Sequence, residues 1–200
     1  MICRKDKFIF IHVPKTAGTS IENALICQDC SLVANQVERG IPLNHLTIRE
    51  AIQYGHITLK ELKSYFVFSF VRNPWDRVVS DIFYFQFVPE FQNKTFPSKV
   101  KTYCNISNTS VYGNHLNPQV DFFEGYWQYV DFIGTFERLH QDFSHVTKIL
   151  GKPSIKLAHL NSSNHPHYSK LLTPELIELI RNKYRQDIKK FDYKYLSSDF

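Results

Sequence analysis

Two polar stretches, each of which follows an apolar run, contain the residue types that bind phosphate groups. The first lies between the apolar run 8–13 and a segment, 21–26, whose apolar positions recur at helical spacing. Its residues are Lys15, Thr16, Ala17, Gly18, Thr19 and Ser20. The start of a helix leaves backbone N–H groups without partners and carries partial positive charge, so several donors can hold an anion there. The spacing therefore predicts a strand, an anion-binding loop and a helix.

Individual side chains add to this loop. Gly18 lets the backbone approach a ligand closely, and the hydroxyls of Thr19 and Ser20 can donate hydrogen bonds. Lys15 supplies a mobile positive charge. The nucleoside triphosphatase loop G-x-x-x-x-G-K-[ST] has its lysine after the second glycine, whereas Lys15 precedes Gly18. Taken alone, the loop is compatible with anion binding and with an ordinary strand-to-helix turn that carries a surface lysine.

A second stretch has the same organisation. The aromatic and β-branched run 65–71 is followed by Arg72, and Pro74 is placed to begin a helix. Ser80 lies about two helical turns after Asn73, so we expect its side chain to face the strand end from which Arg72 emerges. A guanidinium group forms paired hydrogen bonds with phosphate oxygens, and a hydroxyl can add another. Arg72 and Ser80 are therefore predicted to hold one phosphate.

Together, the two stretches resemble the sulfotransferases that use 3'-phosphoadenosine 5'-phosphosulfate, specifically the Golgi-type carbohydrate sulfotransferase family and its bacterial and viral relatives. H-V-P-K-T-A-G-T-S (12–20) is similar to that family's 5'-phosphosulfate loop, and F-V-R-N-P-W-D-R-V-V-S (70–80) is similar to its 3'-phosphate motif. The similarity continues through V-D-F-I-G-T-F-E-R-L (130–139). The alternation of strands and helices predicts an α/β fold, and the resemblance implies a P-loop-like, three-layer fold with a central parallel sheet flanked by helices.

The resemblance also implies roles for single residues. The loop from Lys15 to Ser20 would bind the 5'-phosphosulfate, and Arg72 with Ser80 would bind the 3'-phosphate. Sulfuryl transfer to an alcohol requires removal of the hydroxyl proton, which a group that titrates near neutrality does well. In the family, the segment that corresponds to H-L-T (45–47) lies beside the acceptor site, so His45 is predicted to be the general base. Lys15 would stabilise charge on the bridging oxygen, and no metal is needed.

The histidine assignment has alternatives. Thr47 and Glu50 form a capping-box pattern, so His45 should lie on a loop just before a short helix, where it could also cap or pack locally. His115 is a second candidate for the base, in the irregular segment 89–118, and the sequence also fits a solvent-exposed loop histidine there. We interpret 89–118 as loops on the acceptor side, with a short helix around 97–104.

Two other functions are compatible with parts of the pattern. An ATP-dependent P-loop kinase would use a similar loop, but the order of Lys15 and Gly18 and the lack of an obvious magnesium-binding Asp after a strand argue against it. A noncatalytic nucleotide- or sugar-binding protein could keep the fold without the chemistry. The joint presence of Lys15, His45, Arg72 and Ser80 favours an enzyme.

Composition limits the partners. The chain has 200 residues, with 24 Lys and Arg against 19 Asp and Glu, for a formal charge of +5. This balance favours an anionic nucleotide and a carbohydrate acceptor, such as an acidic polysaccharide, but the basic residues are too scattered to predict nucleic-acid binding. Cys27-x-x-Cys30 could form a redox pair or half a zinc site, but no second Cys/His pair at zinc-finger spacing is present, so no metal site is predicted.

The chain shows no signal peptide and no apolar segment long enough to cross a bilayer. The Golgi relatives carry a membrane anchor, so we expect a cytoplasmic protein, with a trimmed lumenal domain as the less favoured alternative. Two hundred residues are enough for one sulfotransferase domain, 1–200. The sequence does not indicate an oligomeric state.

Further elements follow from hydrophobic spacing. The patterns predict an irregular loop over 28–44 and, later in the chain, helices, strands and one loop. The helices are expected at 59–64, 75–87, 119–124, 137–150 and 173–190, the strands at 129–134 and 155–160, and the loop at 161–168. Glu137 follows a strand end and could contact a ligand or cap its helix. The loop 161–168 could belong to the adenosine 3'-phosphate side or form a plain surface loop.

Overall fold

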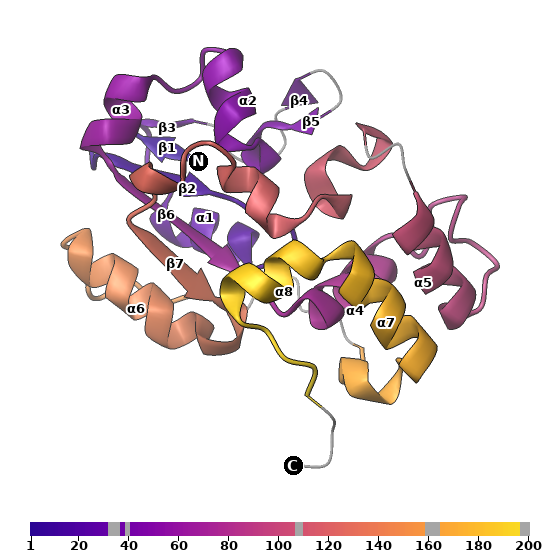
Figure 1. The fold of residues 1–200 in the computed structure, drawn as a ribbon. Coiled ribbons are helices and arrows are strands. Elements are labelled where there is room, and N and C mark those ends of the chain that lie inside the picture. The colour runs from indigo at the N-terminus through magenta and orange to yellow at the C-terminus, as the bar shows by residue number, and fades with distance from the viewer. Residues whose placement is uncertain (32–36, 39–40, 107–109, 159–164, 197–200) are drawn as a thin grey trace.

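The computed structural model describes residues 1–31, 37–38, 41–106, 110–158 and 165–196. In this part of the chain the main sheet has five strands, in the order β3-β1-β2-β6-β7. These strands are β1 (Ile2–Cys3), β2 (Phe8–Ile11), β3 (Cys30–Ser31), β6 (Phe66–Val71) and β7 (Phe132–Thr135). β2, β6 and β7 are parallel, as predicted, whereas β1 pairs antiparallel with both β2 and β3. The α/β fold with a parallel core is confirmed, and the two added strands make the sheet mixed (Figure 1).

Helices and short turns connect these strands (Figure 1). The α-helices are α1 (Gly18–Leu25), α2 (Ile48–Gln53), α3 (Leu59–Ser64), α4 (Pro74–Tyr84), α5 (Phe96–Asn105), α6 (Leu139–Ile149), α7 (Pro174–Lys183) and α8 (Arg185–Phe191). Short 3₁₀ helices include η1 (Leu43–His45), η2 (Ser110–Leu116), η3 (Gln119–Phe123) and η5 (Phe136–Arg138). A small second sheet pairs β4 (Val37–Glu38) with β5 (Ile41–Pro42).

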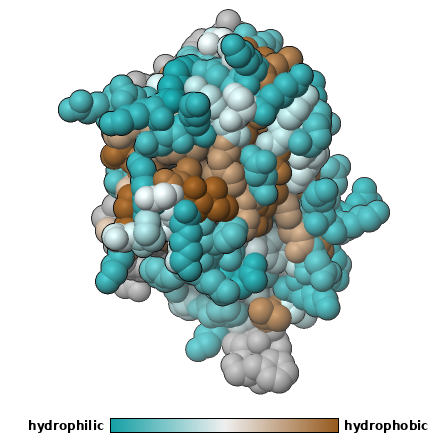
Figure 2. Space-filling model, turned by 90° about the vertical axis from the view of Figure 1, so that its left-hand side faces the viewer, coloured by the Kyte–Doolittle hydropathy of each residue, from teal (hydrophilic) through white to brown (hydrophobic). Residues whose placement is uncertain are grey.

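The strands bury opposite faces against different helices, because successive side chains of a strand point to opposite sides. The phenylalanines of β2 and β6, such as Phe10, pack with α1 and α6. The aliphatic residues between them, such as Ile9, pack with α2, α3 and η3 on the other face. These strands are apolar on both faces because both are covered. The sheet is therefore the middle of three layers, and hydrophilic residues cover most of the side seen in Figure 2, around a hydrophobic band.

A third apolar cluster lies beside the sheet, where α4 packs against α5 and α7 (Figure 1). Trp75, in the first turn of α4, is fully buried there, and its Nε1 donates to the Ile177 carbonyl over 3.0 Å. The side chain of Asn73 accepts from the Trp75 N–H and so caps α4, with Pro74 at the first helical position. This packing anchors the helix that carries Ser80.

Several predicted boundaries were wrong. The loop expected at 28–44 contains β3, β4 and β5, which at two residues each are too short to produce a periodic pattern. No strand forms over 155–158, and 159–160 lie outside the described residues. The helix expected at 75–87 ends at Tyr84, and that expected at 119–124 is the 3₁₀ helix η3. The helix expected from 137 starts at Leu139, after η5.

The last helix, predicted over 173–190, is broken at Tyr184 into α7 and α8. Tyr184 is buried and donates through its hydroxyl to the Leu116 carbonyl over 3.0 Å. Beyond the break, the Asp187 carboxylate accepts the N–H groups of Gln119 and Val120, each over 2.9 Å. The predicted helix is therefore broken at the point where Tyr184 and Asp187 form hydrogen bonds with η2 and η3.

Asp187 also faces a buried cation. Arg77 of α4 is 1% exposed, and its Nη1 lies 3.8 Å from Asp187 Oδ2. Its Nη2 donates to the carbonyls of His115 and Asn117. A buried charge pair costs desolvation but is held by its hydrogen bonds, so removing one partner leaves the other uncompensated. Arg77 and Asp187 thus join α4 and α8 to the segment that carries His115.

Asp187→Ala is expected to lower the free energy of unfolding by about 3–5 kcal/mol, because it leaves Arg77 buried without its carboxylate. The same change at Glu178, which pairs with Arg181 at an exposed position of α7, should cost about 1 kcal/mol or less. Urea unfolding of both variants measures the difference. Equal losses in the two variants would contradict the role given to the buried pair.

Candidate functional site

A cavity of about 1010 Å³ lies at the carboxyl ends of the parallel strands. It is bordered by Lys15 after β2, Arg72 after β6 and Glu137 after β7. Ligand sites of open parallel sheets form at this edge because the strand-to-helix loops converge there. The predicted site residues that border the cavity are Lys15, Ala17, Gly18, Thr19, Ser20, His45, Arg72 and Ser80. The sequence thus indicated residues from four separate segments that the fold brings together.

Thr16 is absent from the cavity lining. It is fully buried, and its hydroxyl donates to the Val13 carbonyl over 2.8 Å. That bond closes the turn after β2. The side chain of Thr16 therefore shapes the loop from within.

The loop before α1 has an unusual backbone. Lys15 and Ala17 have φ angles of 65° and 66°, in the left-handed region that non-glycine residues rarely occupy. Alternation of left-handed with right-handed or extended residues turns successive N–H groups toward one concave side, which suits an anion. Among the described residues, no side chain caps the start of α1, where Ala17 is the N-cap. The loop and helix start therefore present backbone donors at the cavity.

Gly18 is required by its neighbour. A Cβ atom at this position would lie 1.9 Å from Nε2 of His12, so only glycine fits beside that ring. The His12 ring is itself buried, with Nδ1 2.9 Å from Oε1 of Glu22 on α1. Burial lowers the pKa of His12 well below 6.5. The ring therefore acts as a fixed support between β2 and α1.

Lys15 lies largely out of solvent. Burial lowers the pKa of its ammonium group, nearby Asp81 opposes that effect, and the Arg72 charge adds to it. Its Nζ is 4.3 Å from the centre of the Tyr84 ring, on which it forms a cation–π contact. A partly desolvated cation gains more from an incoming anion than one in water. Lys15 is thus suited to bind an anion inside the cavity.

Arg72 is held on every side. Its Nε donates to Asp76 Oδ2 over 2.8 Å, and its Nη1 donates to the Lys15 carbonyl over 3.0 Å. The guanidinium carbon lies 3.9 Å from the centre of the Phe136 ring. The Gln119 amide accepts from the Arg72 N–H and donates to its carbonyl. The hydrogen bond to the Lys15 carbonyl directly links the two motifs that were predicted to bind anions.

Residues next to Arg72 fix the turn. Glu137 Oε1 accepts the Asn73 N–H over 2.7 Å, and Oε2 accepts the hydroxyl of Tyr193 over 3.2 Å. The sequence left two roles open for Glu137, ligand contact and helix capping. The structure shows a third role: Glu137 supports the turn that carries Arg72. Ser80 of α4 is buried and borders the same cavity as Arg72, as the helical spacing predicted.

His45 lies shortly before α2, whose capping box of Thr47 and Glu50 forms as predicted, but it ends the 3₁₀ helix η1 and does not lie on a loop. Its Nδ1 is 3.2 Å from the His12 carbonyl oxygen. A carbonyl can only accept, so Nδ1 carries the proton and Nε2 of the neutral ring has a free lone pair. Burial lowers the pKa of His45 well below 6.5, with His12 and His115 adding to the effect. The ring is therefore neutral at pH 7.

His115 is not a solvent-exposed loop histidine, and that interpretation was wrong. It is 8% exposed, borders the cavity, and its ring centre is 5.1 Å from that of His45. Its Nδ1 lies 2.9 Å from Asp81 Oδ1, a carboxylate that also accepts the hydroxyl of Tyr103 over 2.7 Å. Burial alone would raise the pKa of Asp81, but His115, Arg77 and Lys15 lower it. Asp81 thus orients the His115 ring from behind.

Comparison with known proteins identifies the family of this chain. The model Sulfotransfer_2, described as "Sulfotransferase family", matches residues 1–194. The chain belongs to the sulfotransferase family. A protein of Archaeoglobus fulgidus described as "Uncharacterized protein" is 33% identical over 113 residues, which are 56% of this chain and 90% of that protein. Family membership supports sulfotransferase activity in general and agrees with the α/β fold.

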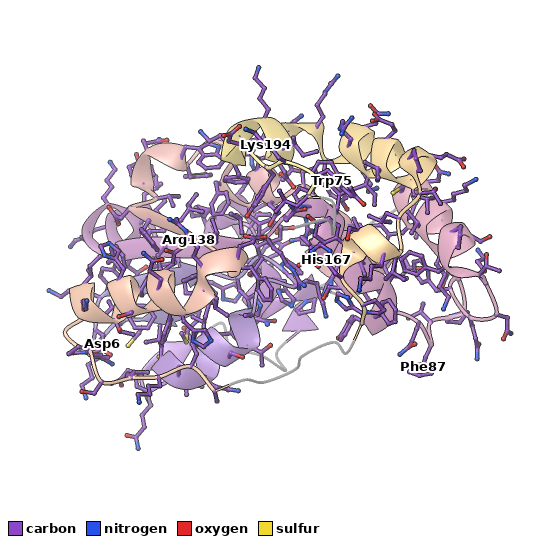
Figure 3. The ribbon with its side chains drawn as sticks, turned by 90° about the horizontal axis from the view of Figure 1, so that it is seen from below. Asp6, Trp75, Phe87, Arg138, His167 and Lys194 are labelled. Carbon is purple, nitrogen blue, oxygen red and sulfur yellow. The ribbon has the colours of Figure 1, made fainter. Side chains whose placement is uncertain are left out.

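Several residues that border this cavity were not predicted, notably Phe136 and Arg138 of η5 and His140 of α6. Arg138 lies on the α6 side of the molecule, whereas Trp75 and His167 lie on the other side (Figure 3). The position of these residues after β7, at the same sheet edge, is the signal that could have indicated them. Their spacing alone matches no phosphate-binding pattern.

The C-terminal half of the sulfotransferase chain also reaches the cavity. Leu157, Ala158 and His165 border it, and the His165 ring stacks on Phe83 of α4 with centres 5.2 Å apart. Residues 161–164 of the predicted loop lie outside the described residues. Among the helices that the structure describes, none is both long and apolar enough to span a bilayer.

Gly18→Ala is expected to lower the melting temperature, because the added methyl group cannot fit beside His12. Overpacking of this kind costs about 1–3 kcal/mol. Gly55→Ala is the matched control: Gly55 has φ of 75°, but an added Cβ would meet no described atom within 4 Å, so only the backbone cost of about 1 kcal/mol remains. Calorimetry compares the two. A larger loss at Gly55 would show that the His12 ring moves aside without cost.

Proposed function

We propose that the chain is one sulfotransferase domain, residues 1–200, that transfers a sulfuryl group from 3'-phosphoadenosine 5'-phosphosulfate to a hydroxyl group of a carbohydrate. The observation that carries this proposal is the 3.0 Å hydrogen bond between Arg72 Nη1 and the Lys15 carbonyl. It holds two anion-binding motifs at one cavity. A nucleotide with anionic groups at both its 5' and 3' positions has one group for each motif.

The loop fits the 5'-phosphosulfate. The left-handed Lys15 and Ala17 shape a concave row of N–H groups, Gly18 leaves room, and Thr19 and Ser20 border the same space. When bound, the phosphosulfate supplies the sulfuryl group and a phosphate that leaves with the bridging oxygen. Lys15 stabilises the negative charge that develops on this oxygen. Its desolvated position makes that stabilisation stronger than in water.

Arg72 and Ser80 fit the 3'-phosphate. Arg72 is already fixed through Asp76, the Lys15 carbonyl and the Phe136 ring, so it loses little conformational freedom on binding an anion. Ser80 adds a hydroxyl from α4. We assign the segment 161–168, of which His165 borders the cavity, to the same adenosine side.

His45 is proposed as the general base. Its Nδ1–H is held by the His12 carbonyl, so Nε2 is the nitrogen that can accept the proton of the acceptor hydroxyl. The oxygen attacks sulfur in line as this proton leaves, and its new bond to sulfur replaces the bond to the bridging oxygen. The neutral state of His45 at pH 7 keeps the base ready without an activation step.

His115 is a second candidate for the base, because its Nδ1 faces the Asp81 carboxylate. A carboxylate behind a histidine holds the ring and stabilises its protonated form. The two rings are neighbours, so a hydroxyl group near one is within reach of the other. Matched substitutions distinguish them.

The acceptor is assigned to carbohydrates from the family resemblance, with an acidic polysaccharide favoured by the formal charge of +5. Aromatic and histidine rings at the cavity, including Phe83, Tyr84 and Phe136, offer flat surfaces for a sugar or adenine ring. Transfer of labelled sulfate to a panel of neutral and acidic glycans tests this assignment.

Lys15→Ala and Arg72→Ala are expected to abolish the rise in melting temperature that adenosine 3',5'-bisphosphate produces without magnesium. For the unchanged chain, the stabilisation should reach about 2.7 kcal/mol at a ligand concentration of 100 times Kd. Lys15→Ala should also abolish turnover. Stabilisation by ATP with magnesium, but not by the bisphosphate, would instead identify a kinase. Binding without any sulfate transfer would identify a noncatalytic binding protein.

His45→Asn should lower kcat about 10²-fold or more while leaving the bisphosphate-induced shift unchanged. The asparagine amide can still donate to the His12 carbonyl, so the variant removes the base and keeps the hydrogen bond. His115→Asn, which can still donate to Asp81, is the matched control. A loss of kcat confined to His115→Asn would transfer the role of base to that residue.

The pH dependence of kcat/KM offers an independent test. A base must be unprotonated, so the rate falls as pH drops through the pKa of His45. Because burial lowers that pKa well below 6.5, kcat/KM should stay level from pH 7 to about 6.5 and decline only under more acidic conditions. A decline that starts above pH 6.5 would contradict a buried neutral base.

A further inference from the structure

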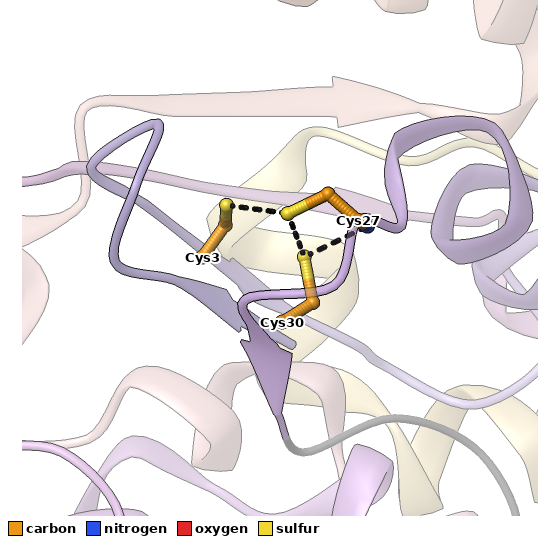
Figure 4. A group of neighbouring side chains, drawn as sticks. All are labelled: Cys3, Cys27 and Cys30. Atoms are coloured by element: carbon orange, nitrogen blue, oxygen red, sulfur yellow. Dashed lines mark hydrogen bonds between the residues drawn. The ribbon is translucent and has the colours of Figure 1, made fainter.

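Three thiols meet at the edge of the sheet, away from the cavity. Cys3 of β1 and Cys30 of β3 are directly paired in the antiparallel register, and Cys27 lies just after α1. The Sγ atom of Cys27 is 3.2 Å from that of Cys3 and 3.2 Å from that of Cys30 (Figure 4). All three Sγ atoms lie within 4.8 Å of one another. We call these residues the thiol triad.

The sequence could not indicate this triad. Cys27-x-x-Cys30 was set aside because no second pair followed at zinc-finger spacing, but the third thiol precedes the motif by 24 residues and arrives through strand pairing. The absence of a second Cys/His pair therefore does not exclude a metal site.

Polar groups lie beside the triad, although the Asp6 carboxylate is not among the ligand atoms that all lie within 4.8 Å of one another. Asp6 Oδ2 lies 3.5 Å from Cys3 Sγ and is paired with Lys152. The backbone N–H of Cys27 points to Cys30 Sγ over 3.3 Å. N–H donors and a nearby cation reduce the excess negative charge of bound thiolates, as groups around metal ligands commonly do. Cys3 is buried, whereas Cys27 and Cys30 are half-buried, so an ion can reach the triad from their side.

We propose that Cys3, Cys27 and Cys30 bind one Zn²⁺ ion, and that the carboxylate of Asp6, which contacts Cys3 Sγ, moves in as the fourth ligand when the ion binds. Zinc prefers four ligands in a tetrahedron, and at a Zn–S distance of about 2.3 Å the sulfur atoms lie about 3.8 Å apart. The two close pairs of the triad need to open by about 0.6 Å to reach that separation. The three thiols lose their protons to solvent as the ion binds, and no group changes oxidation state.

A disulfide is the competing use of these residues. It would join two sulfur atoms at about 2.05 Å and leave the third without a role. In the triad, Cys27 is equally distant from two thiols, and all three are free in the structure. An arrangement with one thiol between two others suits a shared ion better than a single pair.

The proposed ion would be structural. It would connect β1, β3 and the end of α1, the helix whose start forms the anion-binding loop. In the view from below, Asp6 lies at the opposite end of the molecule from Phe87 and well away from Trp75 and His167 (Figure 3). None of Cys3, Asp6, Cys27 and Cys30 is among the described residues that border the cavity, so zinc binding can be tested without an activity assay.

The test uses the full, tag-free chain, purified with a reductant and stripped of metal. Native mass spectrometry with added Zn²⁺ should show one bound ion, and the melting temperature should rise with zinc concentration. Co²⁺ as a probe should give the intense absorption of a tetrahedral thiolate complex. Cys27→Ser and Cys30→Ser should lose all three signals, and Asp6→Asn should weaken zinc binding about 10-fold or more.

Cys104→Ser is the matched control, because Cys104 lies on α5 outside the triad, and it should bind zinc like the unchanged chain. Serine at the half-buried positions 27 and 30 keeps the apo protein folded, which its circular dichroism should show; the fully buried Cys3 is left unchanged for that reason. Zinc binding that survives both Cys27→Ser and Cys30→Ser would indicate histidine binding and overturn the proposal. So would a chain that binds no zinc, or one in which a Cys27–Cys30 disulfide persists under the reductant.

Discussion

The hydrogen bond from Arg72 to the Lys15 carbonyl is the contact on which the site depends. It spans 57 residues of sequence and joins the loop after β2 to the loop after β6. The parallel pairing of these strands brings the two loops to the same edge, and the left-handed backbone of Lys15 accompanies a carbonyl that meets the guanidinium group. Asp76 and Phe136 hold the other parts of Arg72. The two positive groups can stay close because nearby carboxylates and the Lys15 carbonyl offset part of their mutual repulsion.

A buried polar network supports the His115 side of the cavity in a similar way. Asp81 accepts from His115 and Tyr103, while Arg77 binds the carbonyl of His115 and faces Asp187. Each member would be costly to bury alone, but the opposite charges and the hydrogen bonds between the members offset part of that cost, although Arg77 Nε and Nη1 have no hydrogen-bond partner among the described residues. The network fixes the position of a histidine ring that has no regular helix or strand of its own, since η2 is interrupted at Gly113. Buried contacts of α4 and α8 therefore help to determine the geometry of the cavity wall.

Much of the cavity wall that Lys15 and Arg72 form could be predicted from sequence. The apolar runs before Lys15 and Arg72 identified β2 and β6, and Pro74 marked the start of α4. These signals are local, because strand and helix patterns depend on neighbouring residues. The acceptor side depends on distant contacts instead. The buried position of His115 depends on its contact with Asp81, which is 34 residues away in the sequence. No periodic pattern in 89–118 could indicate that contact. The strands β1 and β3 were not predicted for the same reason, because they are defined by their pairing with distant residues and not by their composition.

The conformation of Ala17 has a thermodynamic consequence. An isolated alanine rarely visits left-handed angles, at a cost of about 1–2 kcal/mol, so the curved loop does not persist in an unfolded chain. Tertiary interactions formed during folding compensate for that cost, so the backbone N–H groups of the loop are already aligned before an anion would bind. Ligand affinity and the integrity of the β2–α1 corner are therefore linked quantities. Damage to this corner would first appear as weaker binding, in a protein whose global fold is still intact.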